Sequence, residues 1–174
     1  MRIVKAFLSI FMFLMTANCN AEITGTVVDA ETGEPIEGAV VLVEWTITKG
    51  LPGMTRTESY EIKEALTNKE GKVSISGVLN PLVKGHVTVY KKGYVAWNSA
   101  FIFPGYKKRT DFKWQHDYVF KLDKFKPEYN YNAHWQFILG SVVSRPLEKK
   151  KLMMNAIKWE EDKAFEERQK KDSK

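Results

Sequence analysis

The chain has 174 residues, of which 44% are hydrophobic, and it carries a formal net charge of +6. This length suits one ordinary domain with a tail, and the apolar content is sufficient for a core, which excludes a wholly disordered chain. Lysines are interleaved with glutamates and form no dense basic face, which excludes nucleic acid as a partner. The remaining positive charge serves solubility or favours an anionic surface.

Residues 1–21 have the three parts of a secretory signal peptide. Arg2 and Lys5 supply the positive end, and residues 6–15 form an almost unbroken apolar run that small or polar residues follow. The run of roughly ten residues is too short to cross a bilayer, which needs about twenty, whereas it suits a cleavable signal. We therefore predict an exported protein of the periplasm or cell surface; the alternatives are an anchor helix and a buried helix.

Cys19 is the only cysteine and decides how the leader is processed. Cleavage before it, followed by acylation of its sulfur, would make a lipoprotein attached to the membrane through Cys19 alone. Thr16 and Asn18 are poor matches to the residues that usually precede a lipidated cysteine. Cleavage after Ala21 fits the pattern of small residues better and leaves a mature chain without thiol chemistry or disulfides.

From residue 22 onward, β-branched and aromatic residues alternate with polar ones in short segments between turns, which predicts strands. The strand at 39–47 is apolar enough to be a central strand with both faces covered. Seven such strands favour a β-sandwich. The predicted strands are 23–28, 39–47, 55–67, 73–76, 87–90, 97–103 and 117–125.

Three segments of this body resemble the carboxypeptidase regulatory-like family, a transthyretin-like (prealbumin-like) β-sandwich. They are Ile23-Thr-Gly-Thr-Val-Val-Asp29 with Thr32-Gly-Glu-Pro-Ile-Glu-Gly-Ala-Val-Val41, Thr67-Asn-Lys-Glu-Gly-Lys-Val-Ser-Ile-Ser-Gly77, and Val87-Thr-Val-Tyr-Lys-Lys-Gly-Tyr94. The match covers residues 22–95 well and 96–125 loosely, with Asn68 where aspartate is commoner and Val73 where an aromatic is usual. The resemblance implies a fold without catalytic residues.

The only candidate for catalysis is a set of three histidines: His86, His116 and His134. They lack the spacing of a metal site, and the chain has no nucleophile elbow, P-loop or dinucleotide fingerprint. If the three histidines converged in space, a small periplasmic hydrolase would be the alternative function. Otherwise, we expect no enzyme, no catalytic residue, no metal and no cofactor.

Aromatic residues are concentrated between residues 90 and 137, in segments with loop character. Flat rings beside amides and cations suit stacking on sugar faces or docking in a partner groove. We therefore expect Tyr106, Trp114, Tyr131 and Trp135 to bind a ligand. The alternative is that these segments fold back and cover the edges of the sandwich, which exposed strands require.

Residues from Leu147 to about Lys171 consist of strong helix formers, with Pro146 at the start, and predict a charged C-terminal helix. It either docks on the sandwich, pairs with a partner or lies on a membrane surface.

The sequence therefore predicts a signal peptide (1–21), a β-sandwich (22–125), an aromatic-rich connecting segment (126–145) and a charged helix (146–174). The expected function is a non-catalytic exported binding or structural module of the bacterial cell envelope that contacts protein or glycan. The partner's identity and the oligomeric state stay open.

Overall fold

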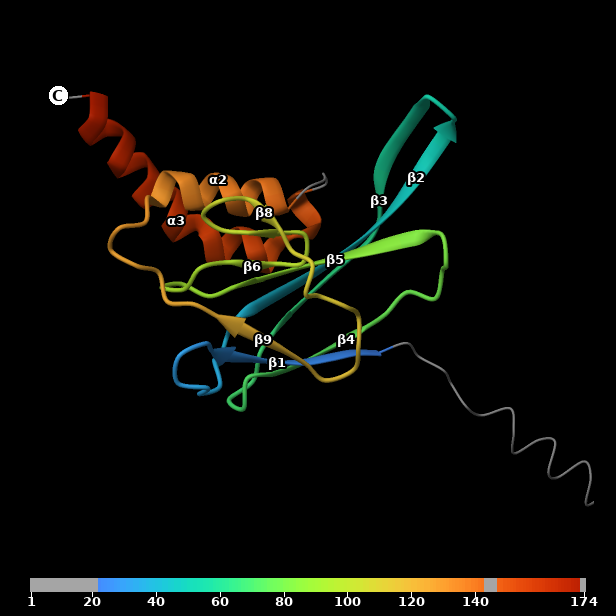
Figure 1. Cartoon of the computed structure of the whole chain (residues 1–174), viewed down its shortest axis with the longest axis horizontal. Helices are drawn as coiled ribbons and strands as arrows, with labels where there is room; N and C mark the ends of the chain where they lie inside the picture. Colours follow the sequence, from blue (N-terminus) through green and yellow to red (C-terminus); the bar gives the residue numbers. More distant parts are fainter. Residues whose placement is uncertain (1–21, 143–146, 173–174) are drawn as a thin grey trace, which may run out of the picture.

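A computed structural model describes residues 22–142 and 147–172 (Figure 1). These residues form nine strands, two α-helices and a short 3-10 turn. The elements are β1 Glu22–Asp29, β2 Val40–Leu51, β3 Met54–Leu66, β4 Lys72–Ser76, β5 Val83–Tyr90, β6 Trp97–Asn98, β7 Phe101–Ile102, β8 Lys107–Lys108, β9 Tyr118–Leu122, α2 Tyr131–Ser141, η2 Leu147–Lys149 and α3 Lys151–Asp172.

Two sheets make the β-sandwich. One has the order β4-β1-β9, in which β1 pairs antiparallel with β4 and parallel with β9. The other has the order β3-β2-β5-β6 and is antiparallel throughout. Side chains from both sheets meet in one core, because alternate residues of each strand point to the same face. Its members include Val27, Val41, Val43, Trp45, Val73, Ile75, Val87, Val89, Trp97, Phe120 and Leu122.

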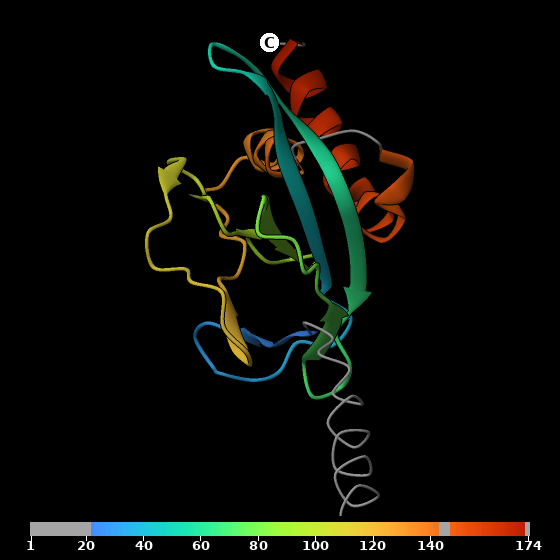
Figure 2. The ribbon, with the colours of Figure 1, turned by 90° about the vertical axis from the view of Figure 1, so that its right-hand side faces the viewer.

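Two helices cover the outer face of the β3-β2-β5-β6 sheet, opposite the other sheet (Figures 1 and 2). Val40, Leu42 and Tyr90 pack there against Phe137 of α2 and Ile157 of α3. The first seven residues of β2 are all buried, which confirms the expectation of a central strand with both faces covered.

β2 and β3 continue beyond the sandwich as a long hairpin that projects from the body (Figure 1). A register shift between Trp45 and Thr46 marks the point where the regular pairing is interrupted. Leu51 and Met54 at the tip are exposed.

The helices begin on carboxylates that come from other elements. Glu64 of β3 accepts hydrogen bonds from the backbone amides of Leu152 and Met153, at 2.9 and 2.8 Å. Glu167 of α3 accepts those of Tyr131 and Asn132, both at 3.0 Å. A carboxylate at a helix N-terminus accepts hydrogen bonds from the free amides and interacts favourably with the positive end of the helix dipole. These contacts therefore fix both helices to their neighbours.

The expectation of seven strands was wrong, since the described residues contain nine. The strand expected over 97–103 divides into β6 and β7 because the Asn98 side chain accepts the amides of Ala100 and Phe101 and turns the chain there. β7 then pairs with β8, and the two form a small separate ribbon.

The expectation of loop character over residues 129–135 was also wrong, because α2 begins at Tyr131. Asn130 caps this helix by accepting the Ala133 amide at 2.8 Å. Phe137 and Ile138 bury its inner face. The expected C-terminal helix is confirmed as α3, preceded by η2.

Candidate functional site

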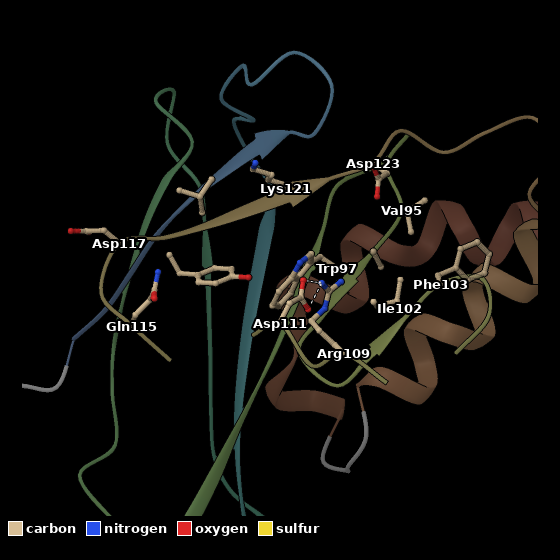
Figure 3. Close-up of a pocket in the computed structure, with 13 residues that line it drawn as sticks. Val95, Trp97, Ile102, Phe103, Arg109, Asp111, Gln115, Asp117, Lys121 and Asp123 are labelled. Atoms are coloured by element: carbon tan, nitrogen blue, oxygen red, sulfur yellow. Dashed lines mark hydrogen bonds and ion pairs between the residues drawn. The ribbon is translucent and has the colours of Figure 1, made fainter. Parts of the chain in front are cut away.

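A groove of about 520 Å³ lies where the edge strands of the two sheets meet, between β6 and β9 (Figure 3). The segment that carries β7 and β8 forms its third wall. A groove of this size lies in the range of ligand-binding pockets in proteins. The residues that line it are Val95, Ala96, Trp97, Ile102, Phe103, Arg109, Asp111, Gln115, Asp117, Tyr118, Val119, Lys121 and Asp123.

Arg109 is held firmly in the wall of the groove. Its guanidinium lies over the Trp97 ring at 4.5 Å, and its Nε donates to the Asn98 carbonyl at 2.8 Å. Nη1 forms an ion pair with Asp111 at 3.3 Å. Stacking and two polar contacts leave the guanidinium little freedom, so it is a fixed positive group.

Tyr118 adds a hydroxyl to the groove from another wall, the one formed by β9. Burial raises the pKa of the Tyr118 hydroxyl, and the charge of Asp111 raises it further, whereas Arg109 opposes the shift. The hydroxyl therefore stays protonated and can donate a hydrogen bond. With Gln115, Asp117, Lys121 and Asp123, the groove offers both charges and uncharged polar groups.

β9 supplies a free strand edge to the groove. It is the last strand of its sheet, paired along its length with β1 alone. On the side away from β1, the Asp123 carbonyl accepts the Val95 amide at 2.8 Å. Because successive residues of a strand direct their backbone groups to opposite sides, Val119 and Lys121 direct theirs to the same side as Asp123. Within the described part of the chain, they have no backbone partner there.

The four predicted ligand-binding residues do not line this groove, and they do not form one cluster elsewhere. Tyr106 is exposed and meets Phe137 edge to face, on the helix side. Tyr131 begins α2 and stacks on Phe125. The remaining two lie elsewhere: Trp135 is on α2 beneath Arg168, and Trp114 rests against β5 at Gly85.

The alternative to ligand binding was that the aromatic segments cover the sandwich edges. Part of the structure agrees with this alternative. Phe112 contacts Trp97 and Trp114, so the segment before β9 folds back on the sandwich. It leaves the groove between this segment and β9 open.

The three histidines occupy three different surroundings. His134 is a fully buried residue of α2, where its Nε2 accepts the Ala96 amide at 2.9 Å and its Nδ1 lies 3.2 Å from Glu160. His86 is on β5 in register with Glu44 of β2, and His116 is exposed before β9. Burial and the Lys84 charge lower the pKa of His86, whereas Glu44 opposes them.

Within residues 22–142 and 147–172, no group of three or more His, Cys, Asp or Glu side chains is arranged to hold a metal ion. The same residues contain no helix that is long and apolar enough to span a bilayer. The predicted signal peptide and Cys19 lie outside the described residues.

No family model matches the chain, and no curated protein matches it. Similar solved structures include the C-terminal domain of the shaft pilin spaA from Lactobacillus rhamnosus GG, with 19% identity over 60% of this chain and 98% of that one, at a TM-score of 0.36. A streptococcal ancillary pilin matches with 18% identity over 62% of this chain and 30% of that one, at a TM-score of 0.32. The pilus 2b backbone protein of group B streptococcus matches with 15% identity over 63% and 46% of the two chains, at 0.34. Similarities this low define neither the family nor the function of the chain.

Sequence reasoning missed the residues that build the groove, above all Arg109, Val119 and Lys121. For Val119 and Lys121, the sequence offers one indication, which is the alternation in β9 of these exposed residues with buried Phe120 and Leu122. That alternation predicts a strand, but not that the strand is at an edge.

Proposed function

We propose that this protein is a non-catalytic, exported β-sandwich of the carboxypeptidase regulatory-like type that binds a partner protein of the bacterial cell envelope. The partner contributes an extended segment, which adds as a strand to the free edge of β9 inside the groove. The observation that carries the proposal is the pair of unpaired backbone positions, Val119 and Lys121, beside an open groove.

Strand addition explains why the groove contains both a strand edge and fixed side-chain groups. Backbone hydrogen bonds from Val119 and Lys121 would supply affinity, and pockets for alternate side chains would supply specificity. Arg109 would face the added segment from the wall opposite β9, and Tyr118 would border it from β9 itself. An exposed strand edge otherwise invites unspecific pairing, so a partner that covers it also protects the fold.

Export is the second part of the proposal and rests on the features of residues 1–21. The short apolar run and its basic start support cleavage by a signal peptidase. Processing after Ala21 would release a soluble protein, whereas acylation of Cys19 would attach it to a membrane. Mass spectrometry of the mature N-terminus separates the two: a diacylglyceryl-cysteine at the start would contradict cleavage after Ala21.

The strand-addition test compares two substitutions at one position. Lys121→Pro removes the amide that faces the groove, whereas Lys121→Ala removes only the side chain. A photo-crosslinking residue at position 119 would capture the partner in cells. We expect one dominant cross-linked protein, retained in Lys121→Ala and lost in Lys121→Pro.

Position 69 serves as the control for the cross-linker, because Lys69 is exposed in the turn before β4. The same cross-linked product from position 69, or equal capture by both Lys121 variants, would refute strand addition. The circular dichroism spectrum of Lys121→Pro must match that of the parent protein, so that loss of the partner is not loss of the fold.

A further inference from the structure

A second depression, of about 430 Å³, lies along the first part of β5, which does not pair with β6, next to the ribbon of β7 and β8. Its lining is strongly basic and aromatic, and none of its lining residues is an aspartate or glutamate. The basic and aromatic residues of the lining include Lys84, Lys108, Lys113, His86, Phe101 and Trp114.

The three lysines are not neutralised by the protein. Within the described part of the chain, no carboxylate forms an ion pair with Lys84, Lys108 or Lys113. They come from three separate segments, β5, β8 and the loop before β9. Like charges gathered on one depression repel each other, and an anion bound among them would relieve this repulsion.

Trp114 is both fixed and accessible. Its indole lies so close to β5 that a Cβ at Gly85 would be 2.7 Å from the ring atom Cζ2. Phe112 contacts its ring edge to face, with a centroid distance of 5.2 Å. Nevertheless, 42% of the residue is exposed. A rigid, exposed ring loses little conformational entropy when a ligand stacks on it.

His86 contributes an uncharged polar group. Burial lowers its pKa below the usual value, and the neighbouring Lys84 acts in the same direction. The imidazole is therefore neutral at neutral pH and can donate or accept a hydrogen bond. The positive charge of the depression comes from the lysines and from Arg109, which is already paired with Asp111.

We infer that this depression, the basic pocket, binds an acidic sugar, one that carries a carboxylate or a phosphate. The sugar ring stacks on Trp114, while its anionic group lies among Lys84, Lys108 and Lys113. An acidic peptide would form ion pairs with the lysines equally well, but its carboxylate side chains have no ring that could stack on the fixed indole of Trp114. Arg109 lines both this pocket and the groove beside β9, but the sugar and the added strand are bound by different groups, so neither proposal depends on the other.

The test is calorimetric titration of the purified protein with tetragalacturonate, a carboxylate sugar, and with mannose 6-phosphate, a phosphate sugar. We expect at least one of them to bind, and to bind about tenfold more weakly when salt is raised from low to about half molar, because exposed charges are screened. Galactotetraose and mannose, the uncharged counterparts, should bind more weakly. The sugar that binds identifies the anionic group.

Two sets of variants locate the site. The first variant combines Lys84→Gln, Lys108→Gln and Lys113→Gln, and it should bind the sugar about 100-fold more weakly. The control variant has the same net charge and combines Lys69→Gln, Lys126→Gln and Lys158→Gln. Its affinity for the sugar should be unchanged. Trp114→Ala should weaken binding about tenfold, and Trp114→Tyr should restore most of it, because a flat ring returns. Equal thermal midpoints in the variants would show that folding is intact.

Three results would overturn the inference. The first is that neither sugar binds, and the second is that inorganic phosphate and polyglutamate bind as tightly as the sugars. The third is that the two triple variants weaken binding equally. The first rejects the ligand class, the second assigns the pocket to anions in general or to acidic peptides, and the third places binding elsewhere.

Discussion

Lys150 and Glu44 form an ion pair of 2.7 Å in the interior, although they are 106 positions apart in the chain. Only 0% and 4% of the two side chains are exposed. The pair connects the residue before α3 to the helix-facing side of β2, so it joins the helical layer to the sandwich. Charges removed from water in this way are tolerated only as a pair.

Lys150→Met should therefore lower the free energy of unfolding by about 3–5 kcal/mol, because it leaves the Glu44 carboxylate buried without its partner. Glu44→Leu should cost a similar amount. The double variant should recover most of the loss, since no charge stays buried. Urea unfolding followed by circular dichroism measures all three, with exposed Lys151→Met as a control. A double variant as unstable as the sum of the single variants would contradict this account.

Glu167→Ala should destabilise the protein by about 1–2 kcal/mol, because the amides of Tyr131 and Asn132 lose their acceptor at the start of α2. The neighbouring Glu166 is a matched control, since it is exposed and forms an ion pair with Lys163 of the same helix. Glu166→Ala should have a much smaller effect. Hydrogen exchange of the α2 amides would show the loss locally, and equal effects of the two substitutions would refute the role of Glu167.

Two glycines should respond to alanine in opposite directions. Gly140 lies in α2, and a Cβ added there would have no neighbour within 4 Å, so Gly140→Ala should stabilise the fold by about 0.5–1 kcal/mol. At Gly25 in β1, a Cβ would lie 2.7 Å from the Phe120 ring, so Gly25→Ala should cost about 1–3 kcal/mol. Thermal unfolding measures both, and shifts of the same sign would contradict the packing described for β1 and β9.

Acid should remove a contribution of Asp29 to stability. Its carboxylate accepts the amides of Thr32 and Glu31 and the Tyr94 hydroxyl, and these bonds, with the Lys124 charge, lower its pKa from 3.8 to about 2. Because the pKa in the folded state is the lower one, the stabilisation is complete above the unfolded value and is lost as pH falls from about 4 to 2.

Asp29→Asn should therefore unfold more easily at neutral pH and show a flatter dependence of stability on pH between about 4 and 2. Tyr94→Phe removes one of the hydrogen bonds and should have an intermediate effect. Urea midpoints across this pH range measure both. An unchanged slope in Asp29→Asn would assign the acid sensitivity to other carboxylates.

The strands were largely predictable because each has a local pattern. Residues 39–47 read as a strand buried on both faces, and β2 is one. The strand expected over 97–103 failed because the Asn98 side chain competes with the ladder for backbone amides, and an alternating pattern does not report that competition.

α2 was missed for a different reason. Its sequence begins with aromatic and amide residues of low helix propensity, and its stability comes from contacts with distant residues. Glu167 satisfies its first amides, and Phe137 and Ile138 pack on the sheet and α3. Neither contribution is visible within the segment itself.

The groove was not predictable, because it depends on which strands are edges. Aromatic content drew attention to Tyr131 and Trp135, which belong to the helical layer instead. Arg109 and Lys121 carry no distinctive motif, and they line one groove only because β6 and β9 lie at the ends of their sheets. Of the predicted aromatic residues, Trp114 lines the basic pocket.

The position of β1 between β4 and β9 has a mechanical consequence. A pull on the chain before Glu22 is transmitted directly into a strand that is paired on both sides. The load is therefore shared by two ladders, and β1 cannot be extracted without tearing open its sheet. If Cys19 carries lipid, two residues separate it from β1, a span of about 10 Å at most. The sandwich would then be held against the membrane by a short tether, with little freedom to reach outward.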